Sequence, residues 1–427
     1  MMDRRIHLIG SFMKSFLLLC GGLLLAAPHA RADSARELTE SYLADLRQRA
    51  VRAHPSVAAA RSRADAATAG IRAVRLWDDP ELGLGVKAAD RMMREDDGDL
   101  RLSLSQKLPR PSVYRAERAM AAAEAAAKQA DTRDAALMTG REAATAANEL
   151  ALADEVVAVQ AAQLDWSGKM LANAKAKALD PTGNAIESLR LEGELARDRQ
   201  MLDSARRTRT GLARRLNVIL GQALDSPWPE LRLPGRAGPT PVAAGEVARL
   251  RRSNPSYLAK LRETDAAAAG GDVARAMRKP EFMIEAETNW WSGGGEYRDT
   301  MIGLKMTLPW FNEPVYRAKI DQADRLTDAA AADAEALKRE LAGKVVASVT
   351  EAENAAREAR AIENDVLPAM EKAATATESA WIGSQAMLTE VLEARRALLA
   401  TRLEQRRSVA AQRAALEELE TLVPRQR

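Results

Sequence analysis

The chain has 427 residues, of which 47% are apolar but only 4% are aromatic. Its hydrophobic material is therefore mostly Ala, Leu and Val, a composition that favours long, closely packed helices over a globule filled with large rings. The 63 Lys and Arg nearly balance the 60 Asp and Glu, and this balance argues against a nucleic-acid binder.

Residues 1–32 have the pattern of a secretory signal peptide. A basic start precedes the apolar residues 16–27, and a small-residue cleavage site, Ala-Arg-Ala, ends at Ala32. The predicted mature chain begins near Asp33. Because residues 1–32 contain four basic residues and one acid, the mature chain keeps 59 residues of each sign and is formally neutral.

The single cysteine, Cys20, lies within the apolar part of this signal, so the mature chain has no thiol and no disulfide. Lipidation of Cys20 is the alternative, but Leu18 and Leu19 precede it where a lipobox wants a small residue. No later segment approaches the ~20 uninterrupted apolar residues of a membrane-spanning helix. We expect an exported protein that is not lipidated.

Comparison of the chain with itself at a shift of 200 residues indicates an internal repeat. Pro55 aligns with Pro255, and Pro109 aligns with Pro309. Such matches carry more weight than matches between alanines in an Ala-rich chain. The expected organisation is a first repeat over 33–226, a Pro- and Gly-rich connector over 227–245, a second repeat over 246–424 and a tail over 425–427.

Each repeat contains two short segments in which apolar and polar residues alternate, the pattern of a strand with one apolar and one polar face. Strands are predicted at about 80–88, 99–108, 281–291 and 299–308. Their polar faces carry Arg101, Glu285, Glu287 and Lys305. A water-filled lumen would require such residues.

Two isolated hairpins would usually cap a soluble domain, but three features favour a bilayer crossing: the polar faces, strands near the ~9 to 11 residues that suit a crossing, and aromatic residues at the strand ends. These aromatics include Trp290, Trp291, Trp310 and Phe311, and such girdles lie at membrane interfaces. Four strands cannot close a barrel, because single-chain barrels begin at ~8 strands. Closure must come from further copies of the chain, and strand arithmetic permits two, three or more.

Residues 112–222 and 314–421 contain few helix breakers. At ~1.5 Å per residue, a helical arm of about 60 residues extends on the order of 90 Å. The first arm is expected to reverse near Gly183 and the second near Gly383. The predicted fold class is therefore mostly α with a small transmembrane β part.

These features, in this order, resemble the TolC family of outer-membrane efflux channels, and within it the heavy-metal and drug efflux subgroup of CzcC and CusC. The resemblance covers essentially the whole mature chain and rests on Asn254-Pro255, on Leu-Ser-Gln-Lys-Leu-Pro at 104–109, and on Ile382-Gly383 followed by residues 388–394. It implies a homotrimer with a twelve-strand barrel in outer-membrane lipid and an α-helical periplasmic tunnel.

The resemblance also implies the function and the partners. Such a channel would passively conduct metal ions, drugs or other small molecules out of a Gram-negative cell. It would receive them from an inner-membrane pump of the RND or ABC type through a periplasmic adaptor, a membrane fusion protein. The turns at Gly183 and Gly383 would contact the adaptor, although the need for a tight turn alone could select glycine there.

Relatives carry an Asp-Val-Leu-Asp-Ala stretch at the periplasmic aperture, and the corresponding residues here are 390–394. Glu390 and Glu393 would then form a ring of six carboxylates in a trimer, which would attract cations. The alternative is that both are solvated acids that pair with Arg395 or Arg396. A bracing tyrosine and arginine found in some members have no obvious counterparts, which leaves open how this gate is locked.

Other functions find little support. His54 is the one histidine of the predicted mature chain, which also lacks Cys, so no tetrahedral N/S metal site is expected within one chain. Met92 and Met93 are interpreted as apolar gap fillers. No cofactor is expected, and no P-loop, dinucleotide fingerprint or His-centred triad marks an enzyme. The alternatives are an outer-membrane component of a type I protein secretion system, or a periplasmic coiled-coil adaptor or scaffold, which would leave the two hairpins unexplained.

Overall fold

A computed structural model describes residues 35–86, 99–179, 185–235, 239–291 and 296–425. Residues 35–427 form one compact unit. The predicted signal peptide with Cys20, the Met92-Met93 pair and Gly183 lie outside the described residues.

The described residues of the first half and of the connector form eight elements. They are β1 (Arg36–Glu37), α1 (Glu40–Ala53), α2 (Pro55–Ala73), β2 (Glu81–Val86), β3 (Asp99–Lys107), α3 (Pro111–Lys177), α4 (Ala185–Ile219) and, in the connector, β4 (Leu231–Arg232).

The second half follows the same order of short helices, hairpin and long helical reversal. It consists of α5 (Ala243–Ser253), α6 (Pro255–Met277), β5 (Phe282–Trp291), β6 (Tyr297–Met306), the 3-10 turn η1 (Pro309–Asn312), α7 (Glu313–Ala361), the π-helical turn η2 (Ile362–Val366), α8 (Leu367–Ile382) and α9 (Leu388–Leu422). The predicted mostly helical fold, with one hairpin and long helices in each half, is confirmed.

The repeated X-Pro dipeptides break the opening helices of both halves at the same place. Pro55 and Pro255 each occupy the first position of a helix, where a missing N–H costs nothing. The residue before each proline caps the new helix: the His54 ring accepts a hydrogen bond from Ser56 N–H, and Asn254 Oδ1 accepts one from Tyr257 N–H at 2.8 Å. The order of cap and Pro that the two halves share thus explains the helix pairs α1–α2 and α5–α6.

The four longer strands form one antiparallel sheet in the order β2-β3-β5-β6. Leu84 lies opposite Leu102, which in turn lies opposite Thr288, and Ser103 lies between Gly83 and Glu287. β2 and β6 are the two edges, and the first edge comes from the first half of the chain while the second comes from the second half.

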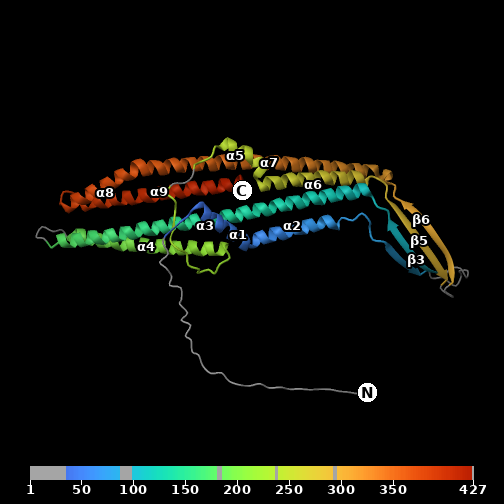
Figure 1. The fold of residues 1–427 in the computed structure, drawn as a ribbon, viewed down its shortest axis with the longest axis horizontal. Helices are drawn as coiled ribbons and strands as arrows, with labels where there is room; N and C mark the ends of the chain where they lie inside the picture. Colours follow the sequence, from blue (N-terminus) through green and yellow to red (C-terminus); the bar gives the residue numbers. More distant parts are fainter. Residues whose placement is uncertain (1–34, 87–98, 180–184, 236–238, 292–295, 426–427) are drawn as a thin grey trace, which may run out of the picture. The chain divides into compact units, whose positions relative to one another are not determined.

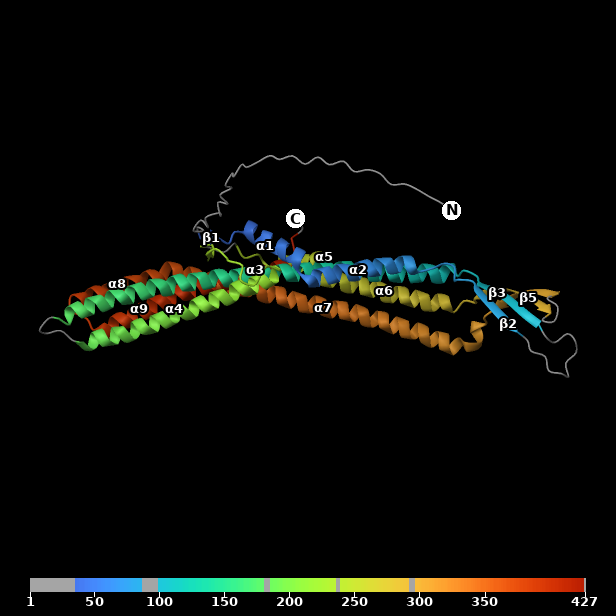
Figure 2. The ribbon, with the colours of Figure 1, turned by 90° about the horizontal axis from the view of Figure 1, so that it is seen from below.

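The helices extend lengthwise from this sheet (Figures 1 and 2). Next to the sheet they pack in the order α2-α3-α6-α7, and beyond the middle of the bundle in the order α4-α3-α9-α8. α3 therefore runs through the centre of both parts. The edge helices again divide by origin, with α2 and α4 from the first half and α7 and α8 from the second.

The middle of the bundle holds the largest apolar cluster, in which α1, α3, α4 and the connector meet. Leu46, Leu150 and Leu216 are fully buried there, and four alanines of α3 between 143 and 147 allow the neighbouring helices to approach closely. Two adjacent acids of α3 hold the connector: Asp154 accepts from Leu231 N–H at 2.9 Å, and Glu155 accepts from Leu233 N–H at 3.1 Å.

Candidate functional site

The sheet has one apolar face that is open to solvent in the single chain. Leu84 and Ile302 expose 82% and 77% of their surface. The same face carries further large apolar residues: Leu82, Val86, Leu100, Leu104, Ile284, Leu304 and Met306. A contiguous exposed apolar surface of this kind on a folded chain indicates a membrane or an interaction surface.

The opposite face is polar and carries all four residues that the sequence analysis placed on it. Arg101 Nε lies 3.0 Å from Glu287 Oε1, and Lys305 forms an ion pair with Glu285. The register places these residues on one side of the sheet, together with Ser103. The charges are thus paired across strands, a feature that alternation alone could not reveal because it depends on register.

Aromatic side chains lie at both ends of the β5–β6 hairpin. Trp290 pairs in register with Tyr297 at the end far from the helices. Trp310 and Phe311 lie in η1, just after β6 at the helical end, and are exposed. A strand of ten residues spans about 30 Å, or about 24 Å when tilted, which matches the ~25 Å apolar band of an outer-membrane barrel. The side chain of Trp291 is outside the described part of the structure.

At the far end of the bundle, α8 ends at Ile382 and α9 begins at Leu388. The residue of this turn with a left-handed backbone is Ser384, with φ of 59°. Gly383 has φ of −77°, a torsion angle that any residue can adopt, so a left-handed backbone does not explain the glycine at this position. The neighbouring Met387 is 68% exposed.

An apolar cluster fills the inside of this tip. Trp381 is 2% exposed and packs with Met170, Leu191 and Val391 from three other helices. The Lys177 ammonium lies 4.3 Å from the centre of the Trp381 ring and donates a hydrogen bond to the Trp381 carbonyl. Glu187 accepts a hydrogen bond from the indole at 3.3 Å, so α3, α4 and α8 are joined at the tip.

The two candidate gate acids are both exposed in the single chain. Glu390 lies in the first turn of α9, where its Oε2 accepts a hydrogen bond from Met387 N–H at 3.2 Å. The arginines considered as their partners bind elsewhere: Arg396 lies 2.6 Å from Glu194, and Arg395 donates to Gln163 at 2.9 Å. The carboxylates of Glu390 and Glu393 are therefore not held by these two arginines.

A buried polar network further inside the bundle than the tip cluster was not found from the sequence. Asp198 of α4 accepts hydrogen bonds from Ser167 at 2.5 Å and from Gln163 at 3.2 Å, both on α3. Gln163 in turn accepts from Arg395, whose guanidinium stacks 4.9 Å from the Trp166 ring. Burial lowers the pKa of Arg395. This network ties α4, α3 and α9 together.

Within the described residues, no group of three or more His, Cys, Asp or Glu is arranged to hold a metal ion. No described helix is both long enough and apolar enough to cross a membrane.

The chain was compared with known protein families, curated proteins and solved structures. Residues 247–423 match the family described as outer membrane efflux protein. None of the curated proteins matches the chain in sequence.

Solved structures match over nearly the whole chain. The chain is similar to CusC, with 14% identity and a TM-score of 0.76 over 92% of this chain and 95% of that one. It is similar to the outer membrane protein VceC from Vibrio cholerae, with 19% identity and a TM-score of 0.72 over 90% and 95%, and to the CmeC outer membrane channel of Campylobacter jejuni, with 13% identity and a TM-score of 0.75 over 93% and 90%.

At these identities the likeness establishes the fold. The predicted TolC-like fold is confirmed, and it extends over both halves of the chain.

Proposed function

We propose that this protein is the outer-membrane channel subunit of a tripartite efflux system. The observation that carries the proposal is the sheet: four strands with one exposed apolar face, one polar face of paired charges, and two open edges. The strand length and the aromatic residues at both ends of the β5–β6 hairpin support insertion of this sheet in the outer membrane. Export then depends on residues 1–32 acting as a signal peptide.

Open sheet edges are not tolerated in lipid, because unpaired backbone groups cannot find water there. β6 of one copy can pair with β2 of the next. The edge helices α7 and α8 lie on the same edge as β6, and α2 and α4 on the same edge as β2, so they can meet in the same way. Such a head-to-tail contact generates a ring when the rotation between neighbouring copies closes. Three copies give a barrel of twelve strands, which is the arrangement that the family resemblance implies.

The long bundle would form the periplasmic wall of the channel, and its tip would meet the adaptor. Exposed apolar residues gather around the two helical reversals: Leu179, Ile186, Leu189, Ile382 and Met387. Together with Gly183 and Gly383 they offer a contact for an adaptor hairpin that delivers substrate from an inner-membrane pump. The resemblance of the sequence motifs to the heavy-metal and drug efflux subgroup makes metal ions or drugs the proposed substrates.

Cell fractionation tests the proposal. The channel should be recovered from the outer membrane as an oligomer that resists mild detergent and dissociates on heating. Recovery of the full chain as a monomer in the soluble periplasm would refute the channel and favour a coiled-coil scaffold.

The gate assignment gives a separate prediction. The variant Glu390→Gln with Glu393→Gln should change the cation preference or raise the single-channel conductance in planar bilayers, because six carboxylates leave the aperture of a trimer. Glutamine at 390 can still accept the hydrogen bond from Met387 N–H, so the helix start is preserved. Unchanged conductance and selectivity would remove both residues from the gate.

A further inference from the structure

The edges of the helical wall differ in charge. The first-half edge helices α2 and α4 contain eleven Arg and six acids. The second-half edge, from α7 through η2 to α8, contains nine Lys and Arg and fourteen acids. One edge thus has an excess of five positive charges and the other an excess of five negative charges, although the predicted mature chain is neutral.

Part of the positive charge lies on the side of α4 that its own chain leaves uncovered. α4 packs mainly along α3, and on one flank Glu194 reaches Arg396 of α9. At 3.6 residues per turn, Arg199 and Arg206 project about 120–140° around the helix from Glu194. Both are exposed, and within the described residues neither side chain has an ion pair.

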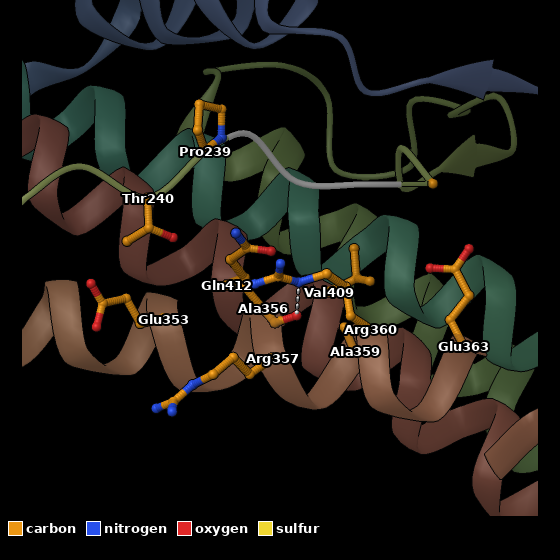
Figure 3. Close-up of a pocket in the computed structure, with 11 residues that line it drawn as sticks. Pro239, Thr240, Glu353, Ala356, Arg357, Ala359, Arg360, Glu363, Val409 and Gln412 are labelled. Carbon is orange, nitrogen blue, oxygen red and sulfur yellow. Dashed lines mark hydrogen bonds between the residues drawn. The ribbon is translucent and has the colours of Figure 1, made fainter. Parts of the chain in front are cut away.

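Part of the negative charge likewise lies on the side of the acidic edge that its own chain leaves uncovered. A cavity of about 570 Å³ lies where the connector passes over α7 and α9, and Glu353 and Glu363 line it (Figure 3). Glu351 and Asp365 are each two residues from one of these acids, so they project to roughly the opposite side of the helix. Both are exposed, and no ion pair holds either of them in the described part of the chain.

The two charged flanks lie at a similar level along the bundle. Arg209 of α4 contacts Asp154 of α3, and the adjacent Glu155 contacts Arg406 of α9. One half-turn further along α9, Ser408 donates to Glu358 of α7. The segment of α4 around Arg206 therefore matches the segment of α7 and η2 that ends near Asp365.

We infer that the basic flank of α4 in one copy meets the acidic flank of α7 and η2 in the next copy, so that opposite charge determines which helical edges join. The occupant of each flank is a second copy of this chain, because the flanks are complementary in charge and continue the edges β2 and β6 of the sheet. The inference rests on the proposed assembly. Like charges oppose the pairing of two α4 edges or of two α7 edges, and this favours a ring over closed dimers.

Reassembly of full-length subunits tests the charged seam, which is the contact between the basic flank of α4 and the acidic flank of α7 and η2 in the next copy. One variant reverses the basic flank, Arg199→Glu with Arg206→Glu, and a second reverses the acidic flank, Glu351→Arg with Asp365→Arg. Each should lower the oligomer recovered after removal of denaturant at 50 mM salt at least tenfold, and the deficit should shrink at 500 mM salt. The control Lys169→Glu with Arg262→Glu places the charge change of the first variant on the central helices α3 and α6 and should stay within twofold of the parent.

Combining both reversals should restore assembly, because the flanks are again complementary. Subunits with both reversals should also exclude parent subunits from mixed oligomers when differently tagged chains are reassembled together. If a charge reversal lowers the helical circular dichroism, the neutral variant Arg199→Gln with Arg206→Gln replaces it. Assembly of this variant should depend less on salt than assembly of the parent. Free mixing, or equal assembly of all variants, would overturn the charged seam, whereas a parent chain that never assembles would overturn the proposed function itself.

Discussion

Replacement of Leu84 by Arg should remove most of the channel from the outer membrane. Leu84 is the most exposed large apolar residue of the sheet's apolar face, and it lies near the middle of β2. An Arg on the lipid face costs ~2–4 kcal/mol at the bilayer midplane, and a trimer would contain three of them. We expect at least a tenfold loss of detergent-stable oligomer in outer-membrane fractions.

The matched control is Ser103→Arg, on the polar face one row away from Leu84. Arg at 103 would lie opposite Glu287 in a wet lumen, so the yield of oligomer should stay within about twofold of the parent. Equal recovery of oligomer from the two variants would show that the apolar face does not contact lipid.

The two faces of the sheet were predictable because alternation fixes which residues of a strand share a face, and gathering the apolar residues of all strands on one side aligns the polar faces on the other. Arg101, Glu285, Glu287 and Lys305 could be placed together on one face for that reason. The ion pairs between them could not, because they depend on which residues lie opposite each other in the folded hairpins.

Helix breaks were predictable where proline occupies the first turn, as at Pro55 and Pro255. The π-helical turn Ile362–Val366 was not predicted, although Pro368 follows it closely. π-Helical turns are rare and occur mostly as single turns inside α-helices, and no residue type in this segment marks one. The sequence therefore suggested one continuous arm up to Gly383, where the structure has two helices joined by this turn.

The tip of the bundle was also only partly predictable from the sequence. The position of the reversal near residue 383 was predictable, but Ser384 takes the left-handed conformation in place of the glycine. Asp198, Gln163 and Arg395 come from three helices far apart in sequence, and each resembles an ordinary surface residue of a charged helix. Only tertiary packing shows that they form one buried network.

The middle of the bundle gives the largest expected effect on stability. Arg47 of α1 donates to both carboxylate oxygens of Glu417 of α9 at 2.5 Å, and the two side chains are 19% and 8% exposed. Glu417→Ala should lower the free energy of unfolding by up to about 3–5 kcal/mol, because the largely buried guanidinium loses both hydrogen bonds and keeps only the longer contact to Glu40 at 4.0 Å. Urea unfolding followed by helical circular dichroism measures this loss, and the double variant Arg47→Met with Glu417→Leu should recover most of it. A loss as large in the double variant as in Glu417→Ala would show that lost packing, and not the unpaired charge, is the cause.

Glu417 also predicts a dependence on pH with a defined sign. Burial raises the pKa of Glu417, and the ion pair with Arg47 offsets this only in part. The folded chain then binds more protons than the unfolded chain at pH values between the ordinary glutamate pKa and the raised one. The contribution of Glu417 to the free energy of unfolding must therefore fall as pH rises through that window. Glu417→Gln removes the titrating group but keeps an acceptor for Arg47. With rising pH, the free energy of unfolding of the parent should therefore fall relative to that of the variant. A difference that is constant across the window, or that shifts toward the parent, would contradict the raised pKa.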